Sequence, residues 1–321
     1  MKIPLEGFRA KFEDLIRLLT TTLLAISLLL EWGGMSFLLE KFTHFKVQYS
    51  FLFLMAGLTL VLLGNFRWAS LAFLGFCMNV IPVYQFCYRD PGSPPSNRST
   101  KLKILHFNVL TSNQNYAACI AAILAKEPDI LGLVETSQQW LDHLKALDTL
   151  YPYAHKIPRD DNFGITLFSK HRLLNTREES FGHYATPTII SEVELDNQII
   201  TVILTHPLPP IERQYFHGRN EQMRGLADFI QHQQLPTILI GDLNMTPWSP
   251  YFLKFIQNSG MVASSQGFGW NATWPQFPLF KIPIDHILTS KNCQTISFEV
   301  LGANGSDHNS ILAVISLPPK D

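Results

Sequence analysis

The stretch Pro236-Thr237-Ile238-Leu239-Ile240-Gly241-Asp242-Leu243-Asn244 joins an apolar, strand-like run to a group of polar residues. A second string, Gly305-Ser306-Asp307-His308, stands just before another apolar run at 310–315. Strand ends can hold carboxylate, amide and imidazole groups at one point, and these groups suit metal-assisted attack of water on phosphorus. Each string alone also fits an ordinary turn, since Asp, Asn and Gly are common turn residues. The hypothesis therefore depends on further motifs in a consistent order.

Polar side chains also end other apolar runs in residues 101–321. Runs predicted as strands at 102–108, 129–134 and 199–205 stop at Asn108, Glu135 and His206. Further strands are predicted at 164–169, 188–195, 237–241, 282–289, 296–300 and 310–316, and helices at 117–126, 140–147 and 219–233. This pattern predicts a sheet-rich α/β domain. Polar groups at so many strand ends are typical of a shared site.

Six motifs follow one another in a recognisable order. They are Lys103-Ile104-Leu105-His106-Phe107-Asn108, Asp129-Ile130-Leu131-Gly132-Leu133-Val134-Glu135, Thr205-His206, Gly241-Asp242-Leu243-Asn244, Ile284-Asp285-His286-Ile287 and Ser306-Asp307-His308. The series, over about residues 101–318, resembles the endonuclease/exonuclease/phosphatase superfamily of nucleases, inositol polyphosphate phosphatases and neutral sphingomyelinases. The resemblance implies an α/β four-layered sandwich, in which two packed mixed, mostly antiparallel sheets lie between outer helices. The whole chain is also similar to bacterial membrane-anchored members.

The resemblance implies roles for eight residues. Glu135 is the principal ligand of Mg²⁺ or Mn²⁺, with Asn108 and Asp307 in the metal region; Asp242 deprotonates water; His308 stabilises charge with Asp285 as its partner; Asn244, His206 and Asn108 bind substrate oxygens. From sequence alone, Asp285 and Asp307 could be exchanged. His286 matches no catalytic position and is expected to be structural. Two neighbouring features are suggestive: Arg213, Arg219 and Arg224 could hold an anion, and Trp270 to Pro275 could wall the site or pack the core.

The first ninety residues have the composition of a membrane region. Apolar runs at 12–30, 47–66 and 68–88 predict about three transmembrane helices within residues 1–89. The Pro/Ser-rich segment 90–100 reads as a linker to a catalytic domain at 101–321. Lys2, Arg9, Lys11 and Arg17 favour a cytoplasmic N-terminus, so three spans would place the catalytic domain on the non-cytoplasmic side of a bacterial inner or plasma membrane.

Charge and cysteine content narrow the function classes. Residues 91–321 carry seventeen Lys/Arg against twenty Asp/Glu, and the sequence shows no basic stripe. Proteins that track along nucleic acid nonspecifically usually have such a stripe, so this class is disfavoured. The four cysteines show no metal-type Cys-x-x-Cys spacing. The expected partners are a phosphate-ester substrate and the lipid bilayer; nucleic acid stays a candidate substrate, and no protein partner is predicted.

Three functions remain open at this point. The first is a metal-dependent hydrolase of a phosphodiester in a nucleic acid, a lipid or a small phosphate ester. The second is a phosphomonoesterase acting on a sugar or inositol phosphate. The resemblance leaves both reactions open, because members of that superfamily carry out both with the same core residues, and loops decide between them. The third is a catalytically inactive, membrane-tethered binding module. This third hypothesis predicts losses among the catalytic positions, yet all of them are filled.

Overall fold

Long apolar runs with few breaking residues dominate the N-terminal part of the chain, and they form helices. In the computed structural model, which describes residues 5–32, 34, 36–88, 99–195 and 198–319, these helices are α1 (Leu5–Leu30), α2 (Phe37–Thr43), α3 (Lys46–Leu62) and α4 (Phe66–Cys87). The chain divides into two compact units, Met1–Phe86 with Trp248–Pro250 and Cys87–Pro247 with Tyr251–Asp321. Most of the predicted linker at 90–100 lies outside the described residues.

One described helix, α4, is long and apolar enough to cross a membrane by itself. The pair α2 and α3 meets the same criterion only if it is counted as one span, bent by 67°. Helix α1 does not meet it, because Glu13, Asp14 and Arg17 place charge inside its apolar stretch. The prediction of three spans therefore depends on the sequence alone for α1 and α3.

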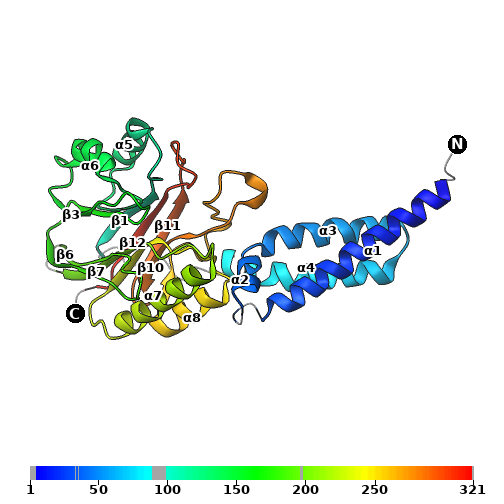
Figure 1. Ribbon diagram of the computed structural model, residues 1–321. Helices are drawn as coiled ribbons and strands as arrows, with labels where there is room; N and C mark the ends of the chain where they lie inside the picture. The colour runs from blue at the N-terminus through cyan, green and yellow to red at the C-terminus, as the bar shows by residue number, and fades with distance from the viewer. Residues whose placement is uncertain (1–4, 33, 35, 89–98, 196–197, 320–321) are drawn as a thin grey trace. The chain divides into compact units, whose positions relative to one another are not determined.

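The second unit contains two six-stranded sheets (Figure 1). The first has the order β11-β12-β1-β2-β4-β3 and comprises β1 (Lys101–Asn108), β2 (Ile130–Val134), β3 (Tyr153–Ile157), β4 (Ile165–Ser169), β11 (Gln294–Val300) and β12 (Ile311–Ser316). The second has the order β5-β6-β7-β8-β10-β9 and comprises β5 (Leu173–Glu179), β6 (Thr188–Leu195), β7 (Gln198–Thr205), β8 (Thr237–Asp242), β9 (Met261–Ala263) and β10 (Asp285–Ser290). Strands β1 and β2 pair in parallel, as do β7 and β8, and the other neighbours are antiparallel.

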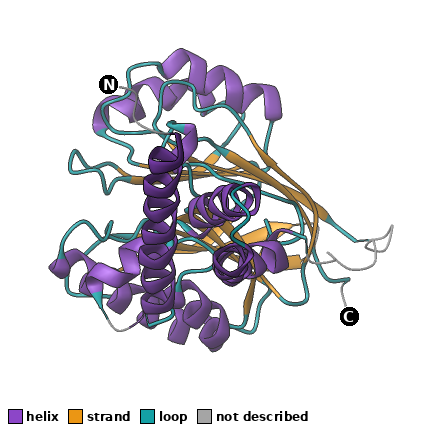
Figure 2. Ribbon diagram, turned by 90° about the vertical axis from the view of Figure 1, so that its right-hand side faces the viewer, coloured by secondary structure: helices purple, strands orange, loops and turns teal. Residues whose placement is uncertain are grey.

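The two sheets pack face to face through a core of aliphatic side chains. Ile104 of β1 and Ile130 of β2 contribute to this core from the first sheet, and Leu204 of β7 and Ile240 of β8 contribute from the second. Gly132 lets the sheets approach closely, because a Cβ at that position would lie 2.9 Å from Ile240 Cγ2 and from Leu204 Cδ1. The strands, orange in Figure 2, thus enclose an apolar interior between them.

Helices cover the outer faces of the sheets (Figure 1). They are α5 (Tyr116–Lys126), α6 (Gln138–Leu144), α7 (Arg213–Gln231) and α8 (Pro250–Ser259), with short 3-10 turns η2 (Lys145–Leu147) and η3 (Pro278–Phe280). Helices α5 and α6 pack against Leu105 and Phe107 of β1, while α7 and α8 lie on the side of the second sheet. The predicted α/β sandwich is confirmed.

The structure also corrects some element boundaries. Helix α7 begins at Arg213, well before the predicted start at Arg219, and helix α8 was not predicted. Strands β3, β5 and β9 were missed as well, and all three lie at sheet edges. Strands β3 and β5 are exposed or half-buried along their length and carry no continuous apolar run, and β9 is only three residues long.

Candidate active site

Strand alternation turns polar side chains into the space between the two sheets. In β1 every second residue from Leu102 onwards faces the second sheet, so His106 and Asn108 point the same way. In β8, Ile238, Ile240 and Asp242 likewise alternate with the other residues and face the first sheet. Each of these strands ends at the same edge of the sandwich as its parallel partner, which brings polar strand ends from both sheets together.

Asp242 and Asp285 form a directly opposed pair in the register of β8 and β10. Both side chains are buried. Across the sheet interface, His106 Nε2 lies 3.0 Å from Asp285 Oδ1. A contact between opposite sheets therefore fixes one oxygen of Asp285.

Glu135 directly follows β2 and leaves the strand alternation. Its φ of 62° lies in the left-handed region, which a glutamate adopts at a cost in free energy. Asn108 Nδ2 donates to its Oε1 at 2.8 Å, and the Thr111 amide donates to its Oε2 at 3.3 Å. The Thr111 hydroxyl also donates to the Glu135 carbonyl oxygen at 3.1 Å. These contacts hold the turn and aim the carboxylate toward Asn108.

The side-chain amide of Asn108 lies at the centre of the polar cluster. Besides Glu135, its Nδ2 donates to Asp242 Oδ2 at 3.2 Å, and it lies 3.4 Å from His308 Nε2. Its Oδ1 accepts the Leu110 amide at 3.1 Å, which fixes the orientation of the group. One amide thus brings together residues from three distant parts of the chain.

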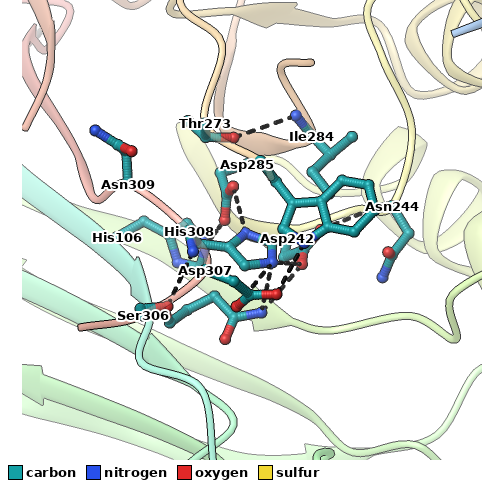
Figure 3. A network of polar contacts seen from close by, with 12 residues as sticks. His106, Asp242, Asn244, Thr273, Ile284, Asp285, Ser306, Asp307, His308 and Asn309 are labelled. Carbon is teal, nitrogen blue, oxygen red and sulfur yellow. Dashed lines mark hydrogen bonds and ion pairs between the residues drawn. The ribbon is translucent and has the colours of Figure 1, made fainter. Parts of the chain in front are cut away.

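His308 is held from both sides (Figure 3). Its Nδ1 lies 2.9 Å from Asp285 Oδ2, and its Nε2 lies 3.6 Å from Asp242 Oδ2. Its backbone amide donates to Ser306 Oγ at 3.0 Å, while that hydroxyl donates to the Asn108 carbonyl at 2.7 Å. His308 Nδ1 donates its hydrogen bond to Asp285, whereas the nearest oxygen of Asp307 lies 4.0 Å from Nε2. This contact separates the two aspartates that the sequence left exchangeable.

Asp307 lies at the rim beside an indole. Trp274 Nε1 donates to Asp307 Oδ2 at 2.9 Å, so this tryptophan walls the site. The other carboxylate oxygen, Oδ1, is buried and accepts no hydrogen bond from the described residues, although His308 Nε2 lies 4.0 Å away. An acceptor of this kind is suited to a cation or a substrate proton donor.

His206 and Asn244 complete the cluster on the side of the second sheet. His206 Nε2 lies 3.6 Å from Asp242 Oδ2, and its Nδ1 is buried without a hydrogen-bond partner among the described residues. Asn244, with a φ of 53°, donates its backbone amide to Asp242 Oδ1 at 2.9 Å. Its side-chain Nδ2 donates to the Pro207 carbonyl at 3.0 Å. The backbone of Asn244 therefore orients Asp242, and the proposed grip of its side chain on substrate stays a prediction.

The family of the chain follows from a sequence comparison that covers this whole cluster. The family model described as Endonuclease/Exonuclease/phosphatase family matches residues 105–308, which is more than half of the chain. The chain belongs to the endonuclease/exonuclease/phosphatase family. Members of the family are phosphoester-hydrolysing nucleases and phosphatases, so the predicted family and enzyme class are confirmed. No curated protein was found to match the chain.

Solved structures of endonuclease/exonuclease/phosphatase proteins share this fold. Humanized TDP2 of D. rerio is 18% identical, with a TM-score of 0.57 over 67% of this chain and 99% of that chain. The human nocturnin catalytic domain with a bound sulfate anion is 19% identical, with a TM-score of 0.56 over 70% and 99%. The mannosyl-6-phosphatase Bt3783 of Bacteroides thetaiotaomicron is 16% identical, with a TM-score of 0.54 over 67% and 100%. At these identities the likeness concerns the fold.

His106 belongs to the polar cluster of this endonuclease/exonuclease/phosphatase protein, although sequence reasoning did not assign it a role. Its Nδ1 lies 3.1 Å from the Gly132 carbonyl oxygen, and its Nε2 contacts Asp285. The signal was available: His106 stands two residues before Asn108 and hence on the same face of β1.

Arg219 and His286 have structural roles. The Arg219 side chain is fully buried, donates to the Asn244 carbonyl at 3.1 Å, and lies over the rings of Phe216 and Tyr251. It is therefore not an exposed anion-binding arginine as the sequence suggested. His286 alternates with core residues and faces away from the sheet interface, and its Nε2 donates to the Met245 carbonyl at 2.7 Å, as expected for a structural residue.

Burial perturbs both carboxylates that flank Asn108. Burial raises the pKa of Glu135, while the hydrogen bonds from Asn108 and Thr111 partly oppose the shift. Burial and the neighbouring charge of Asp285 raise the pKa of Asp242. A carboxylate whose pKa moves toward neutrality is a stronger base, which suits proton abstraction by Asp242.

The histidines differ in charge. Burial alone lowers the pKa of His308, but the charges of Asp285 and Asp242 outweigh it and raise this pKa to about 10. Burial favours the neutral form of Asp285, yet the charge of His308 and the hydrogen bonds from both histidines hold its pKa well below the ordinary value. Burial lowers the pKa of His206. At neutral pH, His308 is therefore cationic and His206 neutral.

Two groups of side chains fit a divalent cation. Asp242, Asp285 and His308 offer ligand atoms within 4.8 Å of one another. In that group, however, both Asp285 oxygens already contact histidines, and His308 holds its proton. Glu135 and Asp307 are neighbouring carboxylates that repel each other, and Asp307 has the unsatisfied oxygen. Hard cations prefer such oxygen ligands, so the Glu135 side of the cluster fits the ion better.

Removing the imidazole of His106 should lower turnover without touching a reacting group. In His106→Leu, Asp285 loses one of its two histidine donors, so His308 is held less firmly. We expect kcat to fall by about 10- to 100-fold with little change in KM. His106→Gln, which keeps a donor, should lose less. Equal kcat values in His106→Leu and the unmodified protein would contradict this role.

His286 should make the protein sensitive to acid. Burial lowers its pKa to about 4, below the ordinary value, so the unfolded chain binds the proton more tightly than the folded one. The stabilisation is complete above about pH 6.5 and is lost as the pH falls toward 4, by about 3 kcal/mol. Thermal unfolding between pH 7 and 4 measures it. In this pH range, His286→Gln should reduce by nearly one the number of protons that the chain takes up on unfolding.

Proposed function

We propose that this chain is a membrane-anchored, divalent-metal-dependent hydrolase that cleaves phosphodiesters by attack of an activated water. The observation that carries the proposal is the convergence of Glu135, Asp242 and His308 on the amide of Asn108. These groups come from both sheets and from the loop before β12. Together they offer an oxygen ligand, a base and a buried cation.

Asp242 is the general base of the proposed reaction. The backbone amide of Asn244 holds its Oδ1, and the side-chain amide of Asn108 contacts its Oδ2, so the carboxylate has one fixed orientation. Its raised pKa favours uptake of a proton from the attacking water. The proton then resides on a carboxyl group whose neutral form burial already favours.

His308 stabilises the negative charge that develops on the phosphate and on the leaving oxygen. Asp285 keeps this imidazolium charged and fixes the ring, which directs Nε2 toward Asp242 and the substrate space. His206 is neutral at pH 7, so it donates through its one N–H group without adding charge. These two histidines share the binding of non-bridging oxygens with Asn108.

Glu135, with Asp307 and Asn108, would hold Mg²⁺ or Mn²⁺. A bound ion of this kind supplies positive charge that polarises the phosphate and favours ionisation of water. The raised pKa of Glu135 supports this assignment, because an adjacent cation stabilises the ionised carboxylate that burial disfavours.

The charge of the cluster supports a diester as substrate. Among the described hydrogen bonds and ion pairs, no lysine or arginine side chain contacts Asn108, Glu135, Asp242, Asp285 or His308. A phosphomonoester dianion demands more positive charge than a diester monoanion. One histidine cation and one metal ion are better matched to the single charge of a diester.

The N-terminal unit anchors the enzyme in the proposed arrangement. Residues 1–89 hold about three spans, 90–100 form the linker, and 101–321 form the catalytic domain. Helix α4 supports this assignment because it is long and apolar enough to cross a membrane. With a cytoplasmic N-terminus, the catalytic domain lies on the non-cytoplasmic side of a bacterial inner or plasma membrane.

An assay of the purified full-length chain in nanodiscs tests the function. We expect Mg²⁺- or Mn²⁺-dependent hydrolysis of bis(p-nitrophenyl) phosphate, at least about tenfold faster than that of p-nitrophenyl phosphate. Single-stranded DNA, RNA and phospholipid serve as natural diesters beside them, and EDTA should abolish all turnover. Faster hydrolysis of the monoester would instead identify a phosphomonoesterase. Absence of hydrolysis with every metal and substrate would leave the inactive binding module as the function.

A further inference from the structure

The segment 270–282, here named the Phe277 loop, exposes large apolar side chains next to the active site. The exposed fractions are 55% for Phe277, 68% for Leu279 and 53% for Phe280. The two phenylalanine rings stack with their centroids 5.6 Å apart around the η3 turn. The tip is therefore one contiguous apolar surface and not a set of scattered side chains.

The base of the Phe277 loop is attached to residues of the active site. Trp274 donates to Asp307, and the backbone of Trp274 pairs with Ile282 to close the loop. Gln276 Nε2 donates to the Asp307 carbonyl at 3.1 Å and to Asn309 Oδ1 at 2.8 Å. These contacts hold the apolar tip in a fixed position beside the segment that carries His308.

The composition of the tip matches the boundary between lipid headgroups and acyl chains. Aromatic rings and leucine favour that boundary, and Lys281 at the end of the turn is the only charged side chain between Trp270 and Ile282. No acidic group in the loop opposes an anionic headgroup. A protein partner of mixed charge could form an ion pair in this loop with Lys281 alone.

The chain itself keeps the loop within reach of lipid. Helix α4 is apolar and long enough to cross a membrane, and thirteen residues separate its last residue, Cys87, from Lys101 at the start of β1. A fully extended segment of that length spans at most about 45 Å. A catalytic unit on so short a tether stays beside the bilayer in which α4 lies.

We propose that the Phe277 loop docks on the lipid bilayer, with Phe277, Leu279 and Phe280 in the headgroup region. This inference depends on the membrane anchoring given under the proposed function, and it adds a substrate class. A docked tip holds Asp307 and His308 next to the membrane surface. The proposed substrate is therefore the phosphodiester of a lipid headgroup. Docking thereby replaces diffusion of a soluble substrate by lateral delivery from the bilayer.

Depth-dependent quenching in full-length protein tests the docking without any need for activity. Leu279→Cys carries a fluorophore in a Cys77→Ser background, because Cys77 is the exposed cysteine while Cys87, Cys119 and Cys293 are buried. Leu124→Cys on α5, where the native side chain is 40% exposed, is the matched control. In nanodiscs containing nitroxide-labelled lipids, we expect quenching at position 279 to exceed that at 124 by at least about threefold.

Equal quenching at the two positions would overturn the proposal. Self-quenching between labels at position 279 in lipid-free protein would overturn it too, because it would show that a second copy of the chain covers the tip. The label experiment keeps its meaning even if the chain hydrolyses no phosphate ester, so the docking and the proposed function can fail separately.

Activity on two forms of substrate gives the second measurement. Phe277→Ser/Phe280→Ser should lower turnover of a phosphodiester lipid in vesicles by about tenfold or more, while hydrolysis of bis(p-nitrophenyl) phosphate stays unchanged. Leu124→Ser should alter neither rate. An equal loss on both substrates would show that the loop acts on the catalytic site itself and would contradict docking.

Discussion

Glu135→Gln should reduce metal-dependent turnover by about a thousandfold or more, since it removes the charge of the proposed principal metal ligand and keeps the shape of the side chain. The contacts from Asn108 and Thr111 that orient the carboxylate can be retained by the glutamine carbonyl oxygen only in part. We expect the apparent affinity for Mn²⁺ to fall together with kcat/KM. Isothermal titration with Mn²⁺ and initial rates over a range of metal concentrations measure the two effects.

The loss must be specific to this carboxylate. Glu178→Gln, on the exposed part of β5, is the matched control and should leave both rate and metal affinity unchanged. A Glu135→Gln protein with unaltered metal affinity would assign the ion to Asp242, Asp285 and His308, the other group that could hold it. Thermal unfolding should show that the variant is folded.

Asp242→Asn should lower kcat by about 10³- to 10⁴-fold while metal binding is retained, because the amide can no longer accept a proton from water. The replacement keeps the shape of the side chain beside Asn108. Burial and the charge of Asp285 disfavour the ionised form of Asp242, so its pKa is raised. A neutral amide relieves that penalty, but its NH2 group cannot accept one of the two hydrogen bonds that Asn244 and Asn108 donate to Asp242. Because the two effects oppose each other, we expect the variant to stay folded, with an unfolding temperature close to that of the unmodified protein.

This combination of lost turnover and retained stability separates catalysis from folding. Rates at saturating substrate, metal affinity and thermal unfolding are compared with those of Asp228→Asn, whose native side chain is exposed on α7. Asp242→Asn with more than about a tenth of the normal kcat would show that another group accepts the proton.

The sequence identified most of the cluster because its members follow regular strands. Asn108 and Asp242 stand at the ends of apolar runs, and alternation places them on the inner face without further information. His106 obeys the same rule but lies within the run, where a histidine is hidden among core residues. Its spacing to Asn108 indicates the same inner face, and its contact with Asp285, 179 residues further along the chain, shows that it belongs to the polar cluster.

Other features depend on geometry that no spacing encodes. The left-handed φ of Glu135 turns it out of the strand pattern, so its direction could not be derived from alternation. Asp307 is the sequence neighbour of His308, and Asp285 lies in the preceding motif. The sequence does not say which of them contacts the imidazole; the packing of β10 against β1 decides for Asp285. Arg219 lies in a polar helix stretch, yet tertiary packing buries it completely.

The polar cluster is divided between two facing sheets, so the spacing of those sheets determines the geometry of the proposed active site. Asn108 moves with one sheet and Asp242 with the other, and the 3.2 Å contact between them crosses the seam. Gly132 lies on that seam, where an added methyl group meets Ile240 and Leu204. A slight separation of the two sheets would move Asp242 away from Asn108, although no residue of the cluster would have been replaced. Apolar positions between the sheets, outside the polar cluster, are thus sites where inherited variation could change or abolish activity.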